Sequence, residues 1–171
     1  MEVRLADSND LPQLRAVYKK IIAHMNKQGI EIWDDIYPCE FFADDIKNKR
    51  LYVLAEHNEI IAAFALCSAN EGEKCVKWEN QNGKAFYLDR LGVNSEHQRK
   101  GYGRAVLGKA AALAGELGAE YLRLFVVDSN TPAIELYRKC GFRQADGIYE
   151  EKIEQDFVLR EFGYEIKIYG L

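Results

Sequence analysis

The sequence predicts an α+β fold with a mixed, mostly antiparallel sheet of about seven strands flanked by helices. Residues 51–57 and 60–68 are two apolar runs joined by Asn58-Glu59, a pattern typical of a hairpin. Residues 121–127 are nearly all apolar, as in a strand covered on both faces. Helical patterns separate the strands, and the expected order is β-α-α-β-β-β-α-β-α-β-β.

The N-terminal part begins with a short strand at residues 2–6, where apolar and polar residues alternate. Pro12 lies early in the next element, where helices accept proline, and Gly29 stands where that helix would stop. Residues 30–46 are aromatic and acidic and are broken at Pro38, so we expect a loop followed by a short helix. The buried stripe of the first helix is expected to contain Leu11, Leu14, Val17, Ile21 and Ile22.

The C-terminal part continues with a strand at residues 85–93 and a helix from Gly103 to Leu117, ended by Gly118. Thr131-Pro132 opens a further helix, which Gly141 closes. The tail, residues 161–169, alternates and predicts a last strand.

Length and composition indicate one globular domain over residues 1–171. Apolar residues make up 48% of the chain and charged residues 29%, an ordinary balance for a folded protein. The net charge of -4 argues against general nucleic-acid binding, which needs a broad basic surface.

The location predicted from the sequence is cytoplasmic. No apolar run approaches the roughly 20 residues that span a bilayer, so we expect no membrane association. The N-terminus lacks the layout of a signal peptide. The cysteines show no metal-ligand spacing, so we expect reduced thiols and no metal site; they are Cys39, Cys67, Cys75 and Cys140.

The most basic stretch of the chain contains Gly101-Tyr102-Gly103 at the start of the helix that follows residues 85–93. A helix N-terminus presents free N–H groups and the positive end of the helix dipole. Glycine lets a bulky anion approach these groups, so the stretch predicts a phosphate or pyrophosphate site.

Two nucleotide-binding motifs compete with this interpretation and both fail. Val106 stands where the dinucleotide pattern G-x-G-x-x-G needs its third glycine. Gly103, Gly108 and Lys109 satisfy G-x-x-x-x-G-K, but Ala110 replaces the Ser/Thr that would hold magnesium.

Two motifs resemble the GCN5-related N-acetyltransferase (GNAT) superfamily. Residues 98–103, QRKGYG, match its Q/R-x-x-G-x-G/A signature, after a strand that ends in Leu91-Gly92-Val93. Asn130, Ala133, Tyr137 and Gly141-Phe142 match its N-x-x-A-x-x-x-Y-x-x-x-G-F pattern. The resemblance spans roughly residues 1–169 and implies a V-shaped, splayed sheet. It also implies acetyl-CoA bound between residues 85–93 and 121–127.

The resemblance implies which residues bind acetyl-CoA. Main-chain groups of the strand around Gly92, which fits a bulge, would pair with pantetheine, and one N–H would face the thioester oxygen. Arg99 and Lys100 have a second interpretation as solvated surface cations, and Asn130 has one as a helix N-cap. The implied set is Leu91, Val93, Gln98, Arg99, Lys100, Gly101, Tyr102, Gly103, Arg104, Asn130 and Ala133.

Tyr137 matches the family's usual general acid, a phenol close to the CoA sulfur. A thiolate of pKa about 8.5 can take a proton from a phenol of about 10 when the geometry is tight. The alternative is a core tyrosine. Asp89 is the candidate base, because strand alternation would place it on the side of Leu91 and Val93. Its alternatives are an ion pair with Arg90 and deprotonation of the amine through water.

The acceptor is expected to contact residues 30–46. Aromatic faces and carboxylates suit a cationic amine, and the candidate residues are Trp33, Asp34, Tyr37 and Trp78. The alternative is that these aromatics are core and the acids a solvated helix face.

The expected function is acetyl-CoA-dependent N-acetylation of a primary amine of a small molecule, by direct attack in a ternary complex. The alternatives are a non-catalytic acyl-CoA-binding sensor module and a protein N-terminal acetyltransferase. A homodimer is also expected, because GNAT proteins often pair and residues 162–168 would offer an edge strand.

Overall fold

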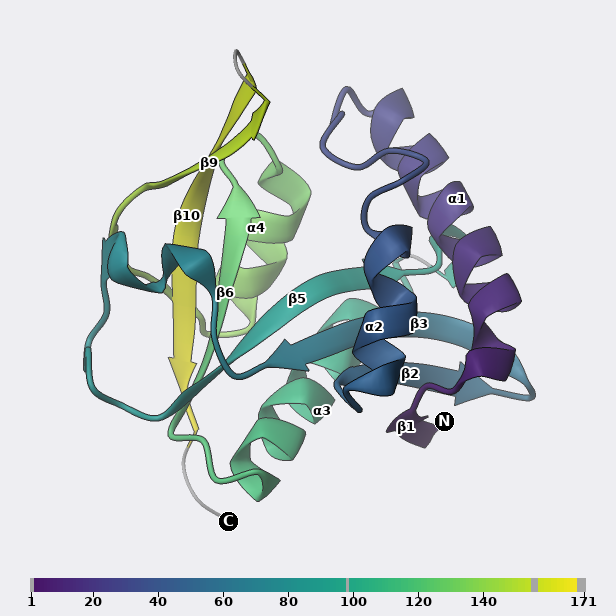
Figure 1. Cartoon of the computed structure of the whole chain (residues 1–171), viewed down its shortest axis with the longest axis horizontal. Helices are drawn as coiled ribbons and strands as arrows, with labels where there is room; N and C mark the ends of the chain where they lie inside the picture. The colour runs from purple at the N-terminus through teal and green to yellow at the C-terminus, as the bar shows by residue number, and fades with distance from the viewer. Residues whose placement is uncertain (1, 98, 155–156, 169–171) are drawn as a thin grey trace. The chain divides into compact units, whose positions relative to one another are not determined.

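The computed structural model describes residues 2–97, 99–154 and 157–168, and these fall into two units (Figure 1). The first unit contains the chain up to Leu66 together with Arg90–Lys109. The second contains Cys67–Asp89 and the chain from Ala110 onward. The expectation of one domain over residues 1–171 therefore stays a prediction.

The first unit contains strands β1 (Glu2–Leu5), β2 (Leu51–Glu56) and β3 (Glu59–Cys67), paired antiparallel in that order. The predicted hairpin is confirmed as β2–β3, with its turn one residue earlier than expected. His57 and Asn58 have φ values of 49° and 66°. Positive φ at both central residues is what a tight type I′ hairpin turn requires.

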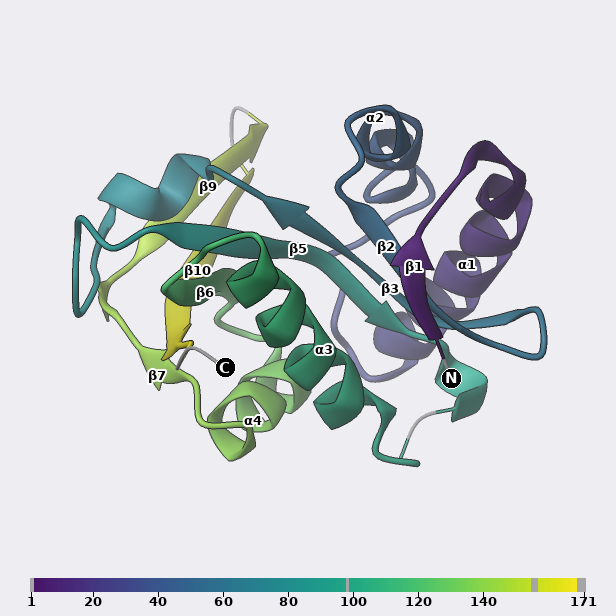
Figure 2. The same ribbon diagram turned by 90° about the horizontal axis from the view of Figure 1, so that it is seen from below.

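Two helices lie on one face of these strands, α1 (Leu11–Lys27) and α2 (Phe42–Lys47), as both views show (Figures 1 and 2). The predicted apolar stripe of α1 is buried at Leu14, Val17, Ile21 and Ile22, and Tyr18 is buried with it. Short 3₁₀ turns precede the two helices, at Ser8–Asp10 and Cys39–Phe41. Residues 30–46 thus form the loop and short helix that were predicted.

Strand β5 (Ala85–Val93) coincides with its predicted range and is followed by a 3₁₀ turn at Ser95–His97. Helix α3 (Tyr102–Glu116) begins and ends one residue before its predicted bounds. Its buried side includes Val106, Leu107 and Ala110. Gly103 and Gly108 therefore lie within a helix, and the phosphate-binding motif G-x-x-x-x-G-K is excluded.

The second unit has the strand order β5, β6 (Tyr121–Val127), β10 (Phe157–Lys167) and β7 (Arg143–Gln144). Ala85–Tyr87 pair parallel with Tyr121–Arg123, whereas β10 pairs antiparallel with both β6 and β7. Strand β9 (Tyr149–Glu154) pairs with β10, and β4 (Val76–Lys77) pairs with β8 (Asp146–Gly147). The predicted class, α+β with a mixed and mostly antiparallel sheet, is confirmed.

The last strand is not the free edge that the dimer prediction assumed. Tyr164 pairs with Leu124 of β6 on one side and with Gln144 of β7 on the other. The described residues contain ten strands, of which eight form one sheet, close to the predicted sheet of about seven, and β4 and β8 form a separate pair. The additional β4, β7 and β8 have two residues each, too few to show a periodic pattern in the sequence.

Helix α4 (Thr131–Lys139) lies along β6 and β10 (Figure 1). Within the described residues, no helix is long and apolar enough to cross a membrane. The same residues contain no group of three or more His, Cys, Asp or Glu that could hold a metal ion.

Candidate active site

The glycine stretch forms a tight turn that leads into α3. Arg99 and Gly101 both have φ in the left-handed region, 61° and 83°. Arg99, Lys100 and Gly101 are exposed, and a side chain built on Gly101 would meet nothing within 4 Å. The N–H groups of the first turn of α3 have no partner inside the helix. The turn therefore presents main-chain donors to open space, beside exposed cations. Gln98 lies outside the described residues.

The segment that enters this turn is anchored to β3. The N–H of Asn94 donates to the carbonyl of Ile61 at 2.8 Å, and Asn94 itself is buried. His97 Nε2 lies 2.8 Å from Oε1 of Glu59, and its ring packs edge-on against Tyr102. The Nδ1 atom of His97 is buried and has no hydrogen-bond partner among the residues described. Sequence reasoning missed both anchors, although Asn before Ser-Glu-His is a recognisable capping residue.

Strand β5 has an irregularity at Arg90, two residues before Gly92. Arg90 has a φ of 55°, whereas Gly92 makes room for a neighbour. A Cβ on Gly92 would lie 2.8 Å from Cζ of Tyr18. The Tyr18 hydroxyl lies 2.5 Å from the carbonyl oxygen of Arg90, and burial raises the pKa of Tyr18, so it stays a donor. Leu91 and Val93 are half-buried.

Arg90 is fixed on its other side by Asp45, the fully buried carboxylate of α2. Arg90 Nε donates to Asp45 Oδ2 at 2.7 Å, and Arg50 Nε donates to Oδ1 at 2.6 Å. The Arg90 guanidinium also lies over the ring of Phe41, 5.3 Å from its centroid. Asp45 is therefore a structural residue of the first unit.

Tyr137 is buried on the inner side of α4 and contacts two other rings. Its centroid lies 5.9 Å from that of Phe142 and 6.3 Å from that of Tyr164. Among the described residues, its hydroxyl has no hydrogen-bond partner. Burial raises the pKa of Tyr137, so the phenol is protonated at neutral pH. This placement agrees with Tyr137 as a core residue. It also leaves the hydroxyl available to act as a general acid.

Asn130 is the N-cap of α4, and its Oδ1 accepts the N–H of Ala133 at 3.4 Å. This is the structural alternative considered for Asn130. It occupies one carbonyl oxygen and leaves the amide NH₂ group for another contact.

Asp89 lies in a group of carboxylates in the second unit. Asn70 Nδ2 donates to Asp89 Oδ1 at 3.4 Å. On β10, Glu161 has its pKa raised to about 8 by burial, by Glu151 of β9 and by Asp89. The alternation on which the orientation of Asp89 was predicted is interrupted at Arg90. Glu161 was missed, because its burial and its contact with Asp89 of β5, 72 positions earlier, depend on the fold.

Three of the six acidic residues of 30–46 have structural partners, and they are Asp34, Asp44 and Asp45. Asp34 Oδ1 accepts the N–H groups of Ile36 and Tyr37 at 2.8 and 2.7 Å, which holds the turn between them. Asp44 pairs with Arg50 at 2.7 Å. These contacts favour the structural interpretation for Asp34, because its Oδ1 atom already accepts two main-chain hydrogen bonds.

The aromatic residues proposed for the acceptor side separate into two kinds. Trp33 stacks on Tyr18, with centroids 5.7 Å apart, and Tyr37 is exposed and lies edge-on to Phe41. Trp78 is only 3% exposed and belongs to the core of the second unit. Its Nε1 donates to the carbonyl of Glu73 at 2.9 Å, and Arg123 covers its ring. The prediction that Trp78 forms a wall of the acceptor site is therefore wrong, because Trp78 is a core residue.

Comparison with known proteins gives the class to which this arrangement belongs. Residues 16–142 match the model of the acetyltransferase (GNAT) family. The chain belongs to the GNAT family, and it is an acetyltransferase of that family.

Individual relatives and structures agree with this assignment. YwnH of Bacillus subtilis (strain 168), a candidate phosphinothricin acetyltransferase, is 25% identical over 99% of this chain and 98% of its own. A GNAT-family acetyltransferase structure from Streptococcus agalactiae 2603 has a TM-score of 0.83 at 19% identity, covering 99% of this chain and 96% of that chain. The structure of yncA from Salmonella typhimurium, determined with its cofactor acetyl-CoA, has a TM-score of 0.64 at 15% identity, covering 98% and 94%.

Proposed function

We propose that the protein transfers the acetyl group of acetyl-CoA to a primary amine of a small molecule, by direct attack in a ternary complex. The observation that carries this proposal is the exposed turn at Arg99–Gly101, which lies directly before α3, where the first N–H groups of a helix have no partner within it. The proposed domain is the whole chain, residues 1–171, in the cytoplasm.

The CoA pyrophosphate is proposed to bind the main-chain N–H groups from Gly101 to Arg104. Negative groups are favoured at a helix N-terminus, and a left-handed glycine carries no Cβ to block them. The exposed cations Arg99 and Lys100 add charge of the right sign. Gln98, Tyr102, Gly103, Asn130 and Ala133 remain proposed contacts of the cofactor, and Leu91 and Val93 are proposed to offer main-chain groups to pantetheine.

The chemical step joins the amine nitrogen to the acetyl carbonyl carbon and breaks the bond from that carbon to sulfur. The ammonium form of the acceptor must lose one proton before attack, and the amine nitrogen loses a second on forming the amide. The thiolate takes one proton, so one proton is released for each amide and thiol formed. Tyr137 is proposed as the donor to sulfur, because its buried phenol is held protonated and its hydroxyl has no partner among the described residues.

Asp89 is proposed as the acceptor of the amine proton, together with Glu161. A carboxyl with a pKa of about 8 is better matched to an ammonium than an ordinary carboxylate. Burial is the main cause of the raised pKa of Glu161, and the neighbouring carboxylates Glu151 and Asp89 add to it.

On the acceptor side we propose Tyr37 and Trp33 of residues 30–46. Tyr37 is exposed, and Trp33 is half-buried and stacks on Tyr18. Asp34 supports this proposal only indirectly, by holding the turn at Tyr37. A homodimer remains a separate proposal, and it no longer rests on an exposed last strand.

The experiment is a transfer assay with the purified protein, acetyl-CoA and a panel of polyamines, aminoglycosides, amino acids and peptides. Release of CoA thiol with equal formation of an acetylated amine is the expected result. Binding of acetyl-CoA without transfer to any of them would favour a non-catalytic acyl-CoA module, and acetylation of peptide N-termini alone would favour a protein acetyltransferase.

The cofactor part has its own test in Gly101→Val. A bulky residue forced into a left-handed conformation rearranges the turn, so acetyl-CoA affinity should fall at least tenfold by calorimetry. Gly108→Val is the matched control, because Gly108 lies on the exposed side of α3 with nothing within 4 Å of its Cβ position. Equal affinities of the two folded variants would contradict the proposed pyrophosphate site.

A further inference from the structure

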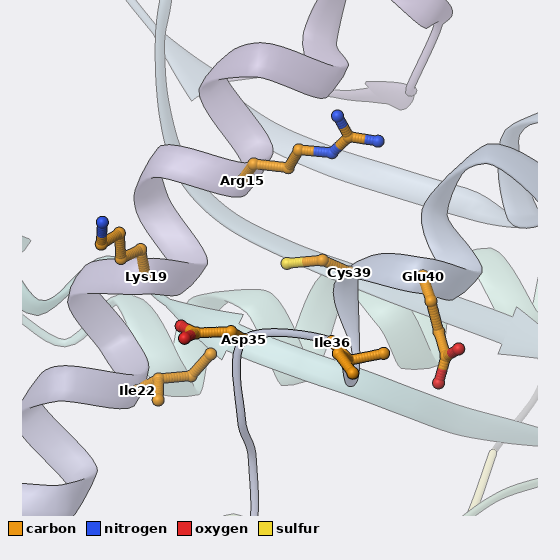
Figure 3. Close-up of a pocket in the computed structure, with 7 residues that line it drawn as sticks. All are labelled: Arg15, Lys19, Ile22, Asp35, Ile36, Cys39 and Glu40. Atoms are coloured by element: carbon orange, nitrogen blue, oxygen red, sulfur yellow. The ribbon is translucent and has the colours of Figure 1, made fainter.

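A pocket of about 350 Å³ lies in the first unit, between α1 and the loop that leads to α2 (Figure 3). Arg15, Lys19 and Ile22 line it from one face of α1, at the i, i+4 and i+7 spacing that brings side chains into one row. The loop contributes the other side, with Asp35, Ile36, Cys39 and Glu40. Binding pockets for small molecules begin at about 300 Å³, so this one suits a small ligand.

The charged groups of this pocket have no ion-pair or hydrogen-bond partner among the residues that the structure describes. Within the described part of the chain, the side chains of Arg15, Lys19, Asp35 and Glu40 form no ion pair and no hydrogen bond. The neighbouring acids behave differently, because Asp34 caps a turn and Asp44 and Asp45 are bound to Arg50. The four charged residues without such contacts all belong to the lining of the pocket.

The two signs of charge come from opposite sides of the pocket. Figure 3 shows the Asp35 carboxylate and the Cys39 sulfur pointing toward α1, which carries Arg15 and Lys19. Burial is the main reason that the pKa of Cys39 is raised, so this thiol is neutral and adds no charge. Ile22 and Ile36 add apolar surface between the charged groups.

From this arrangement we propose that the pocket binds a small zwitterion, an amino acid with an aliphatic side chain. Its carboxylate would be held by Arg15 and Lys19, because a guanidinium can donate two parallel hydrogen bonds to a carboxylate. Its ammonium would be held by Asp35, with Glu40 at the rim, and its side chain would contact Ile22 and Ile36. A polyamine would be repelled by Arg15 and Lys19, which carry the same charge. A dicarboxylate would be repelled by Asp35 and Glu40 for the same reason.

The proposal concerns binding alone, so it does not depend on the proposed acetyl transfer. The probes are L-leucine, L-norleucine and L-methionine, titrated calorimetrically into the purified full-length protein. Two analogues of leucine keep its side chain and lose one charge, 3-methylbutylamine and 4-methylpentanoic acid. We expect at least one amino acid to bind saturably. For leucine we expect a dissociation constant at least tenfold lower than for either analogue.

Variants assign the binding to this pocket. Lys19→Gln, Arg15→Gln and Asp35→Asn should each weaken amino-acid binding roughly 10- to 100-fold, since each removes a charged hydrogen bond. The controls are Lys20→Gln, adjacent on α1 but paired with Glu96 at 2.9 Å, and Asp44→Asn. Acetyl-CoA affinity should be unchanged in all five variants, which separates this site from the proposed cofactor site.

Three results would overturn the proposal. The first is that none of the three amino acids binds saturably. The second is that an analogue with one charge binds as tightly as leucine. The third is that Lys19→Gln and Asp35→Asn, shown to be folded by circular dichroism, bind the amino acid as the wild type does.

Discussion

The guanidinium of Arg90 is held by the carboxylate of Asp45, with Nε and Oδ2 2.7 Å apart and the carboxylate fully buried. This ion pair joins α2 to the residue at which β5 departs from regular strand geometry. The hydroxyl of Tyr18 donates a hydrogen bond to the carbonyl oxygen of Arg90. Both the side chain and the main chain of Arg90 are therefore held by neighbouring residues.

Replacement of Asp45 should destabilise the protein strongly. Asp45→Ala leaves Arg90, whose side chain is 9% exposed, without its buried counter-charge, and the expected loss in unfolding free energy is about 3–5 kcal/mol. Asp44→Ala removes an exposed pair with Arg50 and should cost about 0–1 kcal/mol. Urea unfolding of both variants measures the difference. Similar losses of unfolding free energy in Asp45→Ala and Asp44→Ala would show that the buried Asp45–Arg90 pair does not stabilise the fold more than the exposed pair.

Gly92 should not tolerate even one added carbon. In Gly92→Ala the new Cβ would lie 2.8 Å from Cζ of Tyr18 and 2.9 Å from Cδ1 of Ile21, both in buried side chains. Overpacking of this kind costs about 1–3 kcal/mol. Gly108→Ala, with open space around it, should be neutral or stabilising by up to about 1 kcal/mol. Thermal unfolding compares the two, and a Gly92→Ala protein as stable as wild type would refute the close packing.

Tyr137→Phe should lower kcat about 10²- to 10⁴-fold while acetyl-CoA affinity stays constant, because only the proposed proton donor is lost. The protein should fold normally, since the hydroxyl has no partner among the described residues. Tyr164→Phe is the control: it loses the contacts of its hydroxyl with Arg138 and Gln144, yet should keep kcat within a few fold. Wild-type turnover by Tyr137→Phe, with chemistry rate-limiting, would assign the acid to another group or to water.

Glu161 should make stability depend on pH. Its folded pKa of about 8 lies above the ordinary 4.5, so the folded state binds the proton more tightly than the unfolded state. Its contribution is therefore greatest below pH 4.5 and is lost as the pH rises toward 8, at a cost of up to a few kcal/mol. Unfolding of wild type and Glu161→Gln across this range gives the difference, with Glu150→Gln, exposed on β9, as control. A constant difference between wild type and Glu161→Gln would contradict the buried, acid-surrounded environment.

The sequence was most informative where local chemistry decides the structure. Gly101 lies in a left-handed turn, a conformation that favours glycine. The apolar stripe of α1 marks its buried face, and β5 and β6 are long enough for strand patterns to show in the sequence. The positive φ of Arg99 and Arg90 was not predictable, because non-glycine residues rarely adopt it and are held there by their surroundings.

The features that were missed depend on contacts between distant residues. The Asp45–Arg90 pair joins residues 45 positions apart, and the raised pKa of Glu161 needs β5, β9 and β10 together. Trp78 looked like a binding aromatic because its core partners, Tyr87 and Phe125, are distant in sequence. The last strand looked like an edge because β7 and β9 are too short or too polar to be recognised.

Direct attack of the amine on acetyl-CoA is tested most directly by rapid mixing of the protein with acetyl-CoA, with and without an acceptor amine found in the transfer assay. We predict no burst of CoA thiol without the amine, no acetyl group on the intact protein by mass spectrometry, and one amide per thiol when the amine is present. A thiol burst equal to the enzyme concentration without amine, with acetyl retained on the protein, would contradict the ternary-complex account. The retained group would then be sought on the free cysteines Cys39, Cys67, Cys75 and Cys140.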